Sequence, residues 1–394
     1  MLPATVTKYL ILTITLCTTS CFAETYARDG LPDLSAAEEL LLAAIEGGAF
    51  PGCAVVVGDA DGVIWKAGLG RLDYDAGSSA VTTSTLYDLA SITKVVGTTS
   101  VIFSLIRDGK LALDDRVVKH VPEFGGEMKD GVTIEHLLTH TSGLLSWRSF
   151  YKTCFDPDAI LAEAYQVPVE AEPGTRSRYS DIGFIILGGI AARAGEAVNG
   201  ELERQLVFEP LGMKDTVRNP GEEFFERIAP TETSQRVGPA VKETLPRYKD
   251  KFVHADVHDE NARGAGGMTG HAGLFSTADD LALFAGELLR GVQGKSAIFV
   301  QPLFEKFVTR RNLIEGSSRA LGWDTPEGER PTGGLFSRNS FGHTGFTGTS
   351  LWVDAERGFY LILLTNRVHP TRENQQIRAV RRELGDVVVR CLVR

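Results

Sequence analysis

The chain has 394 residues, of which 43% are hydrophobic, and a formal net charge of −10 at pH 7. Its apolar content suits a globular protein with a substantial core. The acidic balance argues against nucleic acid as a partner, because such binding depends on positive charge.

The first residues resemble a secretory signal peptide. Lys8 supplies a positive charge, and the apolar run over residues 9–17 is too short for a comfortable membrane span. Cys21-Phe22-Ala23 offers small residues for cleavage. We therefore expect cleavage near Ala23 and a periplasmic or secreted mature chain without a transmembrane span. A lipoprotein anchored at Cys21 is the alternative, although Thr18 stands where a lipobox usually has leucine.

Three cysteines remain beyond this segment, at Cys53, Cys154 and Cys391. They allow at most one disulfide, so the fold is not expected to depend on a set of disulfide bonds. The absence of a C-x-x-C pair argues against a structural zinc site. We expect three small buried side chains.

The first elements predicted after the signal are a helix and a hairpin. Residues 34–46 carry apolar side chains at helical spacing, and Gly47-Gly48 ends the pattern. Two strand-like runs follow at 52–57 and 63–69, with a turn rich in Asp and Gly between them. This spacing predicts an antiparallel hairpin.

The chain is organised around a helix that begins at about Ser91 and runs to Arg107. Ser91 and Lys94 are three positions apart, so they share one helix face and their side chains can meet. A serine hydroxyl is a weak nucleophile that needs an adjacent base. A lysine can be that base only if burial or neighbouring cations lower its pKa far below its usual value near 10.4. The helix start also directs a backbone N–H toward an incoming carbonyl oxygen.

The pattern S-x-x-K is loose, and the sequence contains it twice. The second copy, Ser149 to Lys152, follows a turn-rich segment and leads into Cys154-Phe155-Asp156-Pro157. No long helix grows from this copy. Ser91 is therefore the better candidate, provided that partners for Lys94 lie downstream.

Further helices are predicted in the middle of the chain. A short one spans 133–139, and Tyr179-Ser180-Asp181 opens an apolar helix over 182–194. Residues 219–270 are irregular and rich in Pro, Gly and charge. Thr277 then caps a helix whose apolar residues, between 281 and 288, share one face.

The last part of the chain returns to strands. They are predicted at 339–346, 349–354 and 359–365, before a closing helix with an apolar stripe from 377 to 391. Two early and three late strands can form one antiparallel sheet, covered by the first and last helices. The sequence therefore predicts an α+β fold.

Three short elements now follow one another along the chain: Ser91-x-x-Lys94, Tyr179-Ser180-Asp181 and His343-Thr344-Gly345. This order resembles the serine β-lactamase and penicillin-binding-protein superfamily. The version with tyrosine is similar to the class C β-lactamase branch, which also contains D,D-peptidases, D-amino peptidases and carboxylesterases. The resemblance covers nearly all of residues 35–394. Further matching stretches are Leu137 to Gly143, Glu172 to Thr175, Ala272 to Thr277 and Leu321 to Trp323.

The family implies a β-lactamase/transpeptidase-like fold, with an antiparallel sheet flanked by terminal helices and a mostly helical lobe. After a signal over 1–23, a single catalytic domain is expected over 24–394. Its α/β lobe would take in about 35–85 and 290–394, and its helical lobe about 86–289.

The resemblance also implies roles for individual residues. Ser91 attacks the scissile carbonyl and becomes acylated, while Lys94 and Tyr179 exchange the proton, one of them acting as base on Ser91 and later on water. The backbone N–H groups of Ser91 and Phe346 form the expected oxyanion hole, and such fixed donors are often the largest catalytic contribution. The strand with His343-Thr344-Gly345 is expected to line one wall of the cleft.

Two predicted substrate-binding residues depart from the family pattern. Asp181 stands where Asn is usual, and an acid near Lys94 would hold that lysine protonated or repel an anionic substrate. His343 replaces the usual lysine, and histidine is mostly neutral at pH 7. Both departures predict a shift away from substrates with a carboxylate beside the scissile bond. Some D,D-peptidases of this branch carry His-Thr-Gly, so peptide substrates are not excluded.

Two other groups of residues have plainer interpretations. His140 lies in a recurring family turn and is expected to be structural. A histidine- and acid-rich stretch resembles a metal site, but its neighbourhood is glycine-rich and lacks helical periodicity, so we expect neither metal nor cofactor. The residues concerned are His254, Asp256, His258, Asp259, Glu260 and His271. Nearby glycines without a phosphate-binding motif are expected to form a loop at the cleft edge, namely Gly264, Gly266, Gly267 and Gly270.

The leading hypothesis is a secreted serine hydrolase that cleaves an amide or ester through an acyl-enzyme. The two expected types are a D,D-carboxypeptidase, acting on peptidoglycan stem peptides, and a small-ester carboxylesterase. A true β-lactamase is the next alternative, and a non-catalytic penicillin-binding member of the fold is another. The intact Ser91, Lys94 and Tyr179 argue against the non-catalytic alternative. An α/β-hydrolase is excluded because the sequence has no G-x-S-x-G motif.

Overall fold

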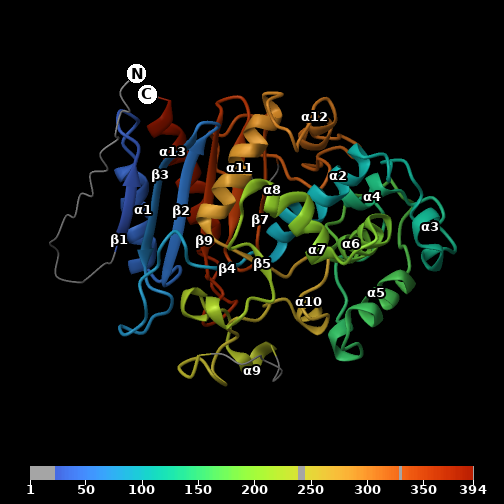
Figure 1. The fold of residues 1–394 in the computed structure, drawn as a ribbon, viewed down its shortest axis with the longest axis horizontal. Helices are drawn as coiled ribbons and strands as arrows, with labels where there is room; N and C mark the ends of the chain where they lie inside the picture. The colour runs from blue at the N-terminus through green and yellow to red at the C-terminus, as the bar shows by residue number, and fades with distance from the viewer. Residues whose placement is uncertain (1–22, 238–244, 328–330, 394) are drawn as a thin grey trace, which may run out of the picture.

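The computed structural model describes residues 23–237, 245–327 and 331–393. A six-stranded antiparallel sheet within them has the strand order β1-β3-β2-β9-β8-β7. Its strands are β1 (Ala23–Ala27), β2 (Gly52–Asp59), β3 (Gly62–Gly70), β7 (Ser340–Thr344), β8 (Ser350–Asp354) and β9 (Phe359–Thr365). The sheet therefore joins the first and last parts of the chain, with β2 beside β9 (Figure 1).

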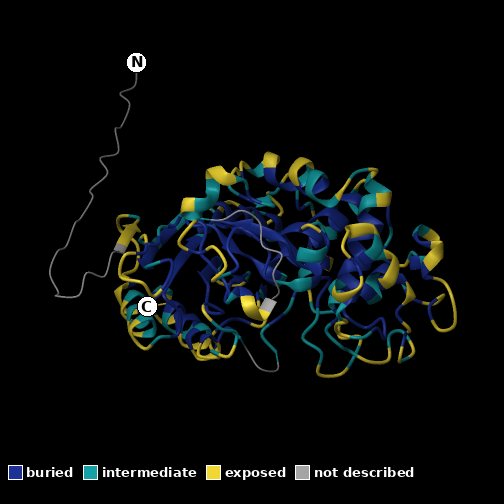
Figure 2. Cartoon of the chain, turned by 90° about the horizontal axis from the view of Figure 1, so that it is seen from below, coloured by how far each residue is buried: buried dark blue, intermediate teal, exposed yellow. Residues whose placement is uncertain are grey.

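Helices cover both faces of this sheet. On one face α1 (Ser35–Glu46) packs beside α13 (Ile377–Leu392), and on the other face lies α11 (Ala278–Val292). Side chains along β2 alternate between the two faces of the sheet. Val55 packs in the hydrophobic cluster with α1 and α13, while the adjacent Val56 packs in the cluster with α11. Figure 2 shows the sheet buried between these layers.

The predicted α+β fold is confirmed, including the early hairpin, the three late strands and the two terminal helices. Sequence reasoning missed β1, which pairs with β3 at the edge of the sheet. It also placed residues 278–289 in the helical lobe, whereas α11 packs against the sheet. The signal peptide and the alternative lipidation site at Cys21 lie outside the described residues, apart from Ala23 at the start of β1.

The helical part of the chain is arranged around α6 (Asp181–Gly195), which contacts α2, α4 and α5. Every residue of α6 from Ile182 to Ala191 is buried, and the Ser180 hydroxyl caps its start by accepting a hydrogen bond from Gly183 N. The other helices are α2 (Ser100–Arg107), α3 (Val117–His120), α4 (Ile134–Leu138), α5 (Pro157–Gln166), α7 (Asn199–Glu203), α8 (Glu209–Leu211), α9 (Ser234–Val237), α10 (Glu260–Gly264) and α12 (Leu303–Val308).

A second, three-stranded sheet connects the two parts of the molecule. Its order is β4-β6-β5, formed by β4 (Tyr87–Asp88), β5 (Val217–Arg218) and β6 (Leu274–Ser276). Strands of two or three residues are too short to show a period in sequence, so this sheet was not predicted. It places Asp88, the last residue of β4, directly before the helical stretch that contains Ser91.

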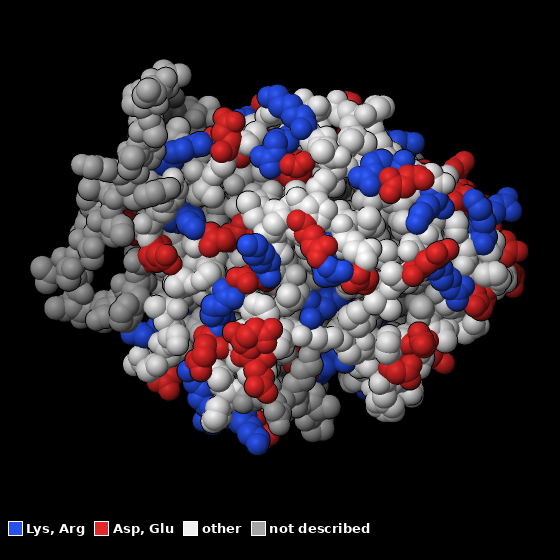
Figure 3. All heavy atoms as spheres, viewed as in Figure 1, with Lys and Arg blue, Asp and Glu red and all other residues white. Residues whose placement is uncertain are grey.

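The three described cysteines are buried and free, as predicted. Acidic and basic side chains are interspersed on the face shown in Figure 3, so the net negative charge is not gathered into one patch there. None of the helices in the described ranges is long and apolar enough to cross a membrane.

Candidate active site

Ser91 begins a helical stretch that is not uniform. It lies in a 3₁₀ turn, η1 (Ala90–Ile92), which is followed by a π-helical segment, η2 (Lys94–Thr99), and then by α2. Ala90 has φ +47°, a left-handed conformation that is costly for a residue with a Cβ. Asp88 Oδ1 holds this turn by accepting a hydrogen bond from Ala90 N at 2.8 Å. Strain next to a predicted nucleophile points to a functional site.

The expected contact between Ser91 and Lys94 is present. Lys94 is completely buried, and its Nζ lies 3.0 Å from Ser91 Oγ. The ammonium also donates to His271 O at 3.0 Å and pairs with Asp181 Oδ1 at 2.7 Å. The contacts with His271 O and Asp181 therefore hold the Lys94 ammonium next to Ser91.

The charge state of Lys94 follows from these neighbours. Burial by itself lowers the pKa of Lys94, but the Asp181 carboxylate and the Tyr179 hydroxyl outweigh burial, so the pKa lies above its usual value. This agrees with the expectation that an acid at position 181 keeps the lysine protonated. In this state Lys94 donates to Ser91 Oγ instead of accepting its proton.

The Tyr179 ring lies close to Lys94 and to Arg319. Its ring centroid is 5.0 Å from Lys94 Nζ and 5.2 Å from the Arg319 guanidinium carbon. Burial raises the pKa of Tyr179, while the nearby Lys94 charge and hydrogen bonds with Lys94 and Ser91 lower it. The hydroxyl is thus coupled to both residues of the S-x-x-K motif.

His140 supports Tyr179 from behind. Its Nδ1 accepts a hydrogen bond from Ser180 N at 3.0 Å, and its ring lies 4.5 Å from the Tyr179 ring. Burial, reinforced by nearby cations, lowers the pKa of His140 well below its usual value, so the ring is neutral. These contacts agree with the structural role expected for His140.

The segment that contains Phe346 is tied to the segment before Ser91. Gly345 N donates to Thr349 O at 2.7 Å, which closes a turn after β7. The Thr347 hydroxyl donates to Asp88 O at 2.6 Å, and the Thr349 hydroxyl donates to Leu89 O at 3.0 Å. These bonds hold together the two backbone segments that carry the expected oxyanion donors.

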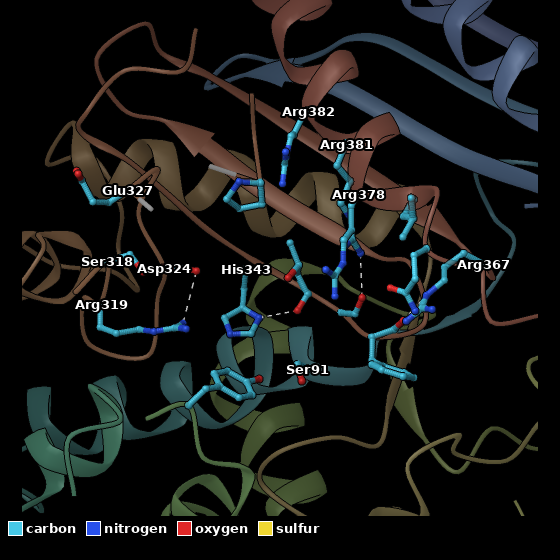
Figure 4. Close-up of a pocket in the computed structure, with 17 residues that line it drawn as sticks. Ser91, Ser318, Arg319, Asp324, Glu327, His343, Arg367, Arg378, Arg381 and Arg382 are labelled. Atoms are coloured by element: carbon cyan, nitrogen blue, oxygen red, sulfur yellow. Dashed lines mark hydrogen bonds and ion pairs between the residues drawn. The ribbon is translucent and has the colours of Figure 1, made fainter. Parts of the chain in front are cut away.

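A cavity of about 520 Å³ opens above Ser91. Most of the residues predicted from sequence line it, namely Ser91, Tyr179, His343, Thr344, Gly345 and Phe346, whereas Lys94 and Asp181 do not. Five arginines share the lining, namely Arg319, Arg367, Arg378, Arg381 and Arg382 (Figure 4).

These arginines correct the sequence-based view of the charge in the cleft. That view counted only Asp181 and the missing motif lysine, and it predicted a shift away from substrates with a carboxylate beside the scissile bond. Arg378 and Arg382 are exposed side chains one turn apart on α13, and neither pairs with a carboxylate among the residues that the structure describes. Their i, i+4 spacing on the polar side of the closing helix was the available signal. The inferred shift toward neutral substrates therefore loses its electrostatic basis.

His343 does not supply a charge of its own. It is buried, and its Nδ1 donates to Thr344 O at 2.8 Å. Burial first, and then the charges of Lys94 and Arg319, lower the pKa of His343 to about 3. The His343 ring is therefore neutral at pH 7 and stays neutral near pH 6.

The histidine-rich stretch is divided among separate contacts. His254 Nε2 donates to Phe225 O at 3.1 Å, His258 pairs with Glu232 at 3.0 Å, and His271 pairs with Asp259 at 2.8 Å. The described part of the chain contains no group of three or more His, Cys, Asp or Glu that could hold a metal ion.

The nearby glycines are not among the residues that line this cavity. Gly270 packs so closely on Gly188 that a Cβ at position 270 would meet Phe184 O in α6. Gly270 O accepts a hydrogen bond from the Thr98 hydroxyl at 2.7 Å. This loop therefore supports η2 from behind.

Comparisons with known proteins agree with this geometry. The family model for Beta-lactamase matches residues 37–386. The chain is 31% identical over 348 residues to the "N-acetylmuramyl-L-alanine amidase" of Bacillus subtilis (strain 168), covering 81% of this chain and 78% of that protein. It is 32% identical over 312 residues to the "Putative D-alanyl-D-alanine carboxypeptidase" of Escherichia coli (strain K12), covering 73% of this chain and 70% of that protein.

Two solved structures show the same fold at lower identity. A penicillin-binding protein homologue from Caulobacter crescentus has a TM-score of 0.72 and 22% identity, covering 94% of this chain and 100% of that one. EstCE1, described as a hydrolase with promiscuous acyltransferase activity, has a TM-score of 0.70 and 21% identity, covering 90% of this chain and 98% of that one.

Proposed function

Because the chain belongs to the β-lactamase family and is a serine hydrolase, we propose that it cleaves an amide or ester of a cell-wall peptide through an acyl-enzyme on Ser91. The observation that carries this proposal is the 3.0 Å contact between Ser91 Oγ and the buried Lys94 Nζ beneath a cavity. The names of the relatives, a D-alanyl-D-alanine carboxypeptidase and a muramyl-alanine amidase, support a peptide of the cell wall as substrate.

The charges around Ser91 suggest how its proton moves. Asp181 keeps Lys94 protonated, so the Tyr179 Oη takes the proton of Ser91 as Oγ attacks the scissile carbonyl carbon. The Lys94 ammonium stabilises the tyrosinate that forms. The negative charge on the carbonyl oxygen is received by the N–H groups of Ser91 and Phe346. Tyr179 then returns the proton to the leaving group and later takes one from the water that releases the acyl group.

The arginines of the cavity favour a leaving group that carries a carboxylate. Arg378 and Arg382 extend from α13 toward the space above Ser91 (Figure 4). A guanidinium without an internal partner binds a carboxylate well, because its donors form a planar fork. This supports a carboxypeptidase-like reaction ahead of hydrolysis of a neutral ester. We also propose that the protein is exported, as the residues before β1 suggest.

Labelling tests the nucleophile. Intact-mass analysis after incubation with a fluorophosphonate should show one adduct, and peptide mapping should place it on Ser91. Ser91→Ala should remove the adduct and leave the unfolding midpoint unchanged, while Ser149→Ala, in the second S-x-x-K copy, should label normally. An adduct on Ser149 would overturn the assignment.

A substrate panel tests the leaving group. We expect Arg378→Gln combined with Arg382→Gln to lower kcat/KM for a D-Ala-D-Ala peptide roughly tenfold, about the effect of one lost charge-assisted hydrogen bond. Hydrolysis of a short-chain nitrophenyl ester should change by less than about twofold. Equal effects on both substrates would contradict recognition of the carboxylate.

A further inference from the structure

Arg381 donates hydrogen bonds to two backbone carbonyls of the turn after β7. Its Nη2 donates to Gly345 O at 2.9 Å and to Thr349 O at 2.6 Å. These carbonyls stand at the two ends of the turn after β7, so one guanidinium nitrogen bridges the turn. Figure 4 shows Arg381 reaching from α13 toward the strand that carries His343.

The carbonyl of Gly345 belongs to the same peptide unit as the N–H of Phe346. In a trans peptide the C=O and the N–H point in opposite directions. A cation that binds this carbonyl therefore lies on the far side of the peptide from an oxyanion that binds the N–H. Because hydrogen bonds in a chain polarise one another, the bond at the carbonyl makes the N–H a stronger donor.

The charge of Arg381 is not cancelled nearby. Arg381 pairs with no carboxylate among the residues 23–237, 245–327 and 331–393, and it lies close to two further cations, Arg367 and Arg378. Burial first, and then the charges of Arg367 and Arg378, lower the pKa of Arg381 to about 9, which leaves it cationic at neutral pH. A fixed charge in a partly desolvated site acts strongly on its neighbours.

Two further hydrogen bonds hold the turn in place. The Phe346 carbonyl accepts a hydrogen bond from Arg367 Nε at 2.8 Å, and Gly348 N donates to Gly345 O at 3.2 Å. The peptide between Gly345 and Phe346 thus has fixed partners at its own carbonyl and at the next one. Phe346 itself lines the cavity that Ser91 also lines.

We propose that Arg381 is a positioning residue of the oxyanion hole, which orients and polarises the Gly345–Phe346 peptide so that its N–H stabilises the tetrahedral intermediate. This inference rests on the proposed function, because it takes Phe346 N–H as the oxyanion donor. Arg381 acts through the peptide and does not itself contact the reacting atoms. Its role is therefore separate from any binding of substrate by Arg378 and Arg382.

Two substitutions and a matched control test this role. Arg381→Met keeps the length of the side chain and removes the charge and the hydrogen bonds. Arg381→Lys keeps the charge and can reach one carbonyl. Arg390→Met is the control, because Arg390 is an exposed arginine near the end of the same helix and does not line the cavity.

The readouts are kcat and KM for a short-chain nitrophenyl ester and the affinity for phenylboronic acid, which forms a tetrahedral adduct on an active serine. Arg381→Met should lower kcat about ten- to a hundredfold, which does not exceed the fall in kcat expected when a whole oxyanion donor is removed. KM should change by less than about threefold. Its affinity for the boronic acid should fall by a similar factor. Arg381→Lys should retain several times more activity than Arg381→Met, and Arg390→Met should match the wild type.

Several outcomes would overturn the proposal. They are an unchanged kcat in Arg381→Met, a loss confined to KM, or a lowered kcat with unchanged boronic acid affinity. If Arg381→Met does not fold, Arg381→Gln takes its place, and an unchanged kcat and boronic acid affinity in that variant would also overturn the proposal. Failure of the wild type to acylate at Ser91 is a different result, because it would refute the proposed function itself.

Discussion

The Asp181 carboxylate lies 2.7 Å from the Nζ of Lys94, whose side chain is completely buried. Asp181 raises the pKa of Lys94 and also raises the pKa of Tyr179. Asp181, one of the two residues that depart from the family pattern, therefore raises the pKa of both groups that can exchange the proton of Ser91. We therefore expect Asp181 to affect how kcat/KM depends on pH.

Replacing Asp181 by Asn should move the acidic limb of the kcat/KM profile to lower pH. Without the carboxylate the pKa of Lys94 and the pKa of Tyr179 both fall, so the form that accepts a proton is populated at lower pH. The ratio of kcat/KM at pH 6 to that at pH 9 should rise at least about threefold. A profile measured from pH 5 to 10 checks this, with Asp61→Asn, exposed at the β2–β3 turn, as control. A limb that stays in place or moves to higher pH would contradict the assignment.

Replacing Gly345 by Ala should nearly abolish acylation. A Cβ at position 345 would collide with the Thr349 hydroxyl and lie 2.5 Å from Leu89 O, a backbone atom that cannot move away freely. Displacing this peptide moves the expected Phe346 donor, so kcat should fall about a hundredfold or more. Gly334→Ala is the matched control, because a Cβ there meets nothing within 4 Å. Comparable rates in both variants would show that the turn does not hold an oxyanion donor.

Replacing Thr347 by Val should weaken catalysis more than binding. The substitution keeps the shape of the side chain but leaves Asp88 O without the hydroxyl that now donates to it at 2.6 Å. An unsatisfied buried carbonyl costs about 1–3 kcal/mol, so we expect the unfolding free energy to fall within that range. The two segments carrying Ser91 and Phe346 would also loosen, and kcat should fall about tenfold. Thr309→Val, at an exposed position after α12, should change neither quantity.

The buried Glu232 should make the protein sensitive to acid. Burial alone would raise the pKa of Glu232, but hydrogen bonds from His258 and Arg372 outweigh it and lower the pKa to about 2. The pKa in the unfolded chain is near 4.3, so the stabilisation is complete above that pH and is lost as the pH falls toward 2. Its size is at most about 3 kcal/mol. His258 stacks on the Phe346 ring at 5.7 Å, so this cluster also supports the cleft.

Denaturant titrations between pH 7 and pH 2 measure this effect. The wild type should lose more unfolding free energy across that range than Glu232→Gln, which should already be less stable at pH 7. Glu127→Gln, at an exposed position, should follow the wild type. A parallel acid response of the wild type and Glu232→Gln would show that Glu232 does not contribute.

The features that could be predicted from the sequence are those set by residues close together in the chain. The spacing of Ser91 and Lys94, the cap at Thr277 and the early hairpin all follow from periods and turn chemistry within a few residues. The π-helical segment after Ser91 carries no such signal, and the contacts of Lys94 at its start, with Asp181 of α6 and with His271 O before β6, are distant in sequence. Arg381 was missed for a related reason. Its role depends on a carbonyl 36 residues away in sequence, which only the sheet brings within reach.

The hydrogen bond from the Thr347 hydroxyl to Asp88 O joins residues that are 259 positions apart. Ser91 can therefore be surrounded by its helices and still lack the second oxyanion donor until β7 has docked beside β8 and β9. Contacts of such long range form slowly, because a large loop must close first. After dilution from denaturant, helical circular dichroism should recover before fluorophosphonate labelling does, and the two rates should differ at least about threefold. The recovery of labelling at Ser91 would then measure the docking of β7, as the last step of folding.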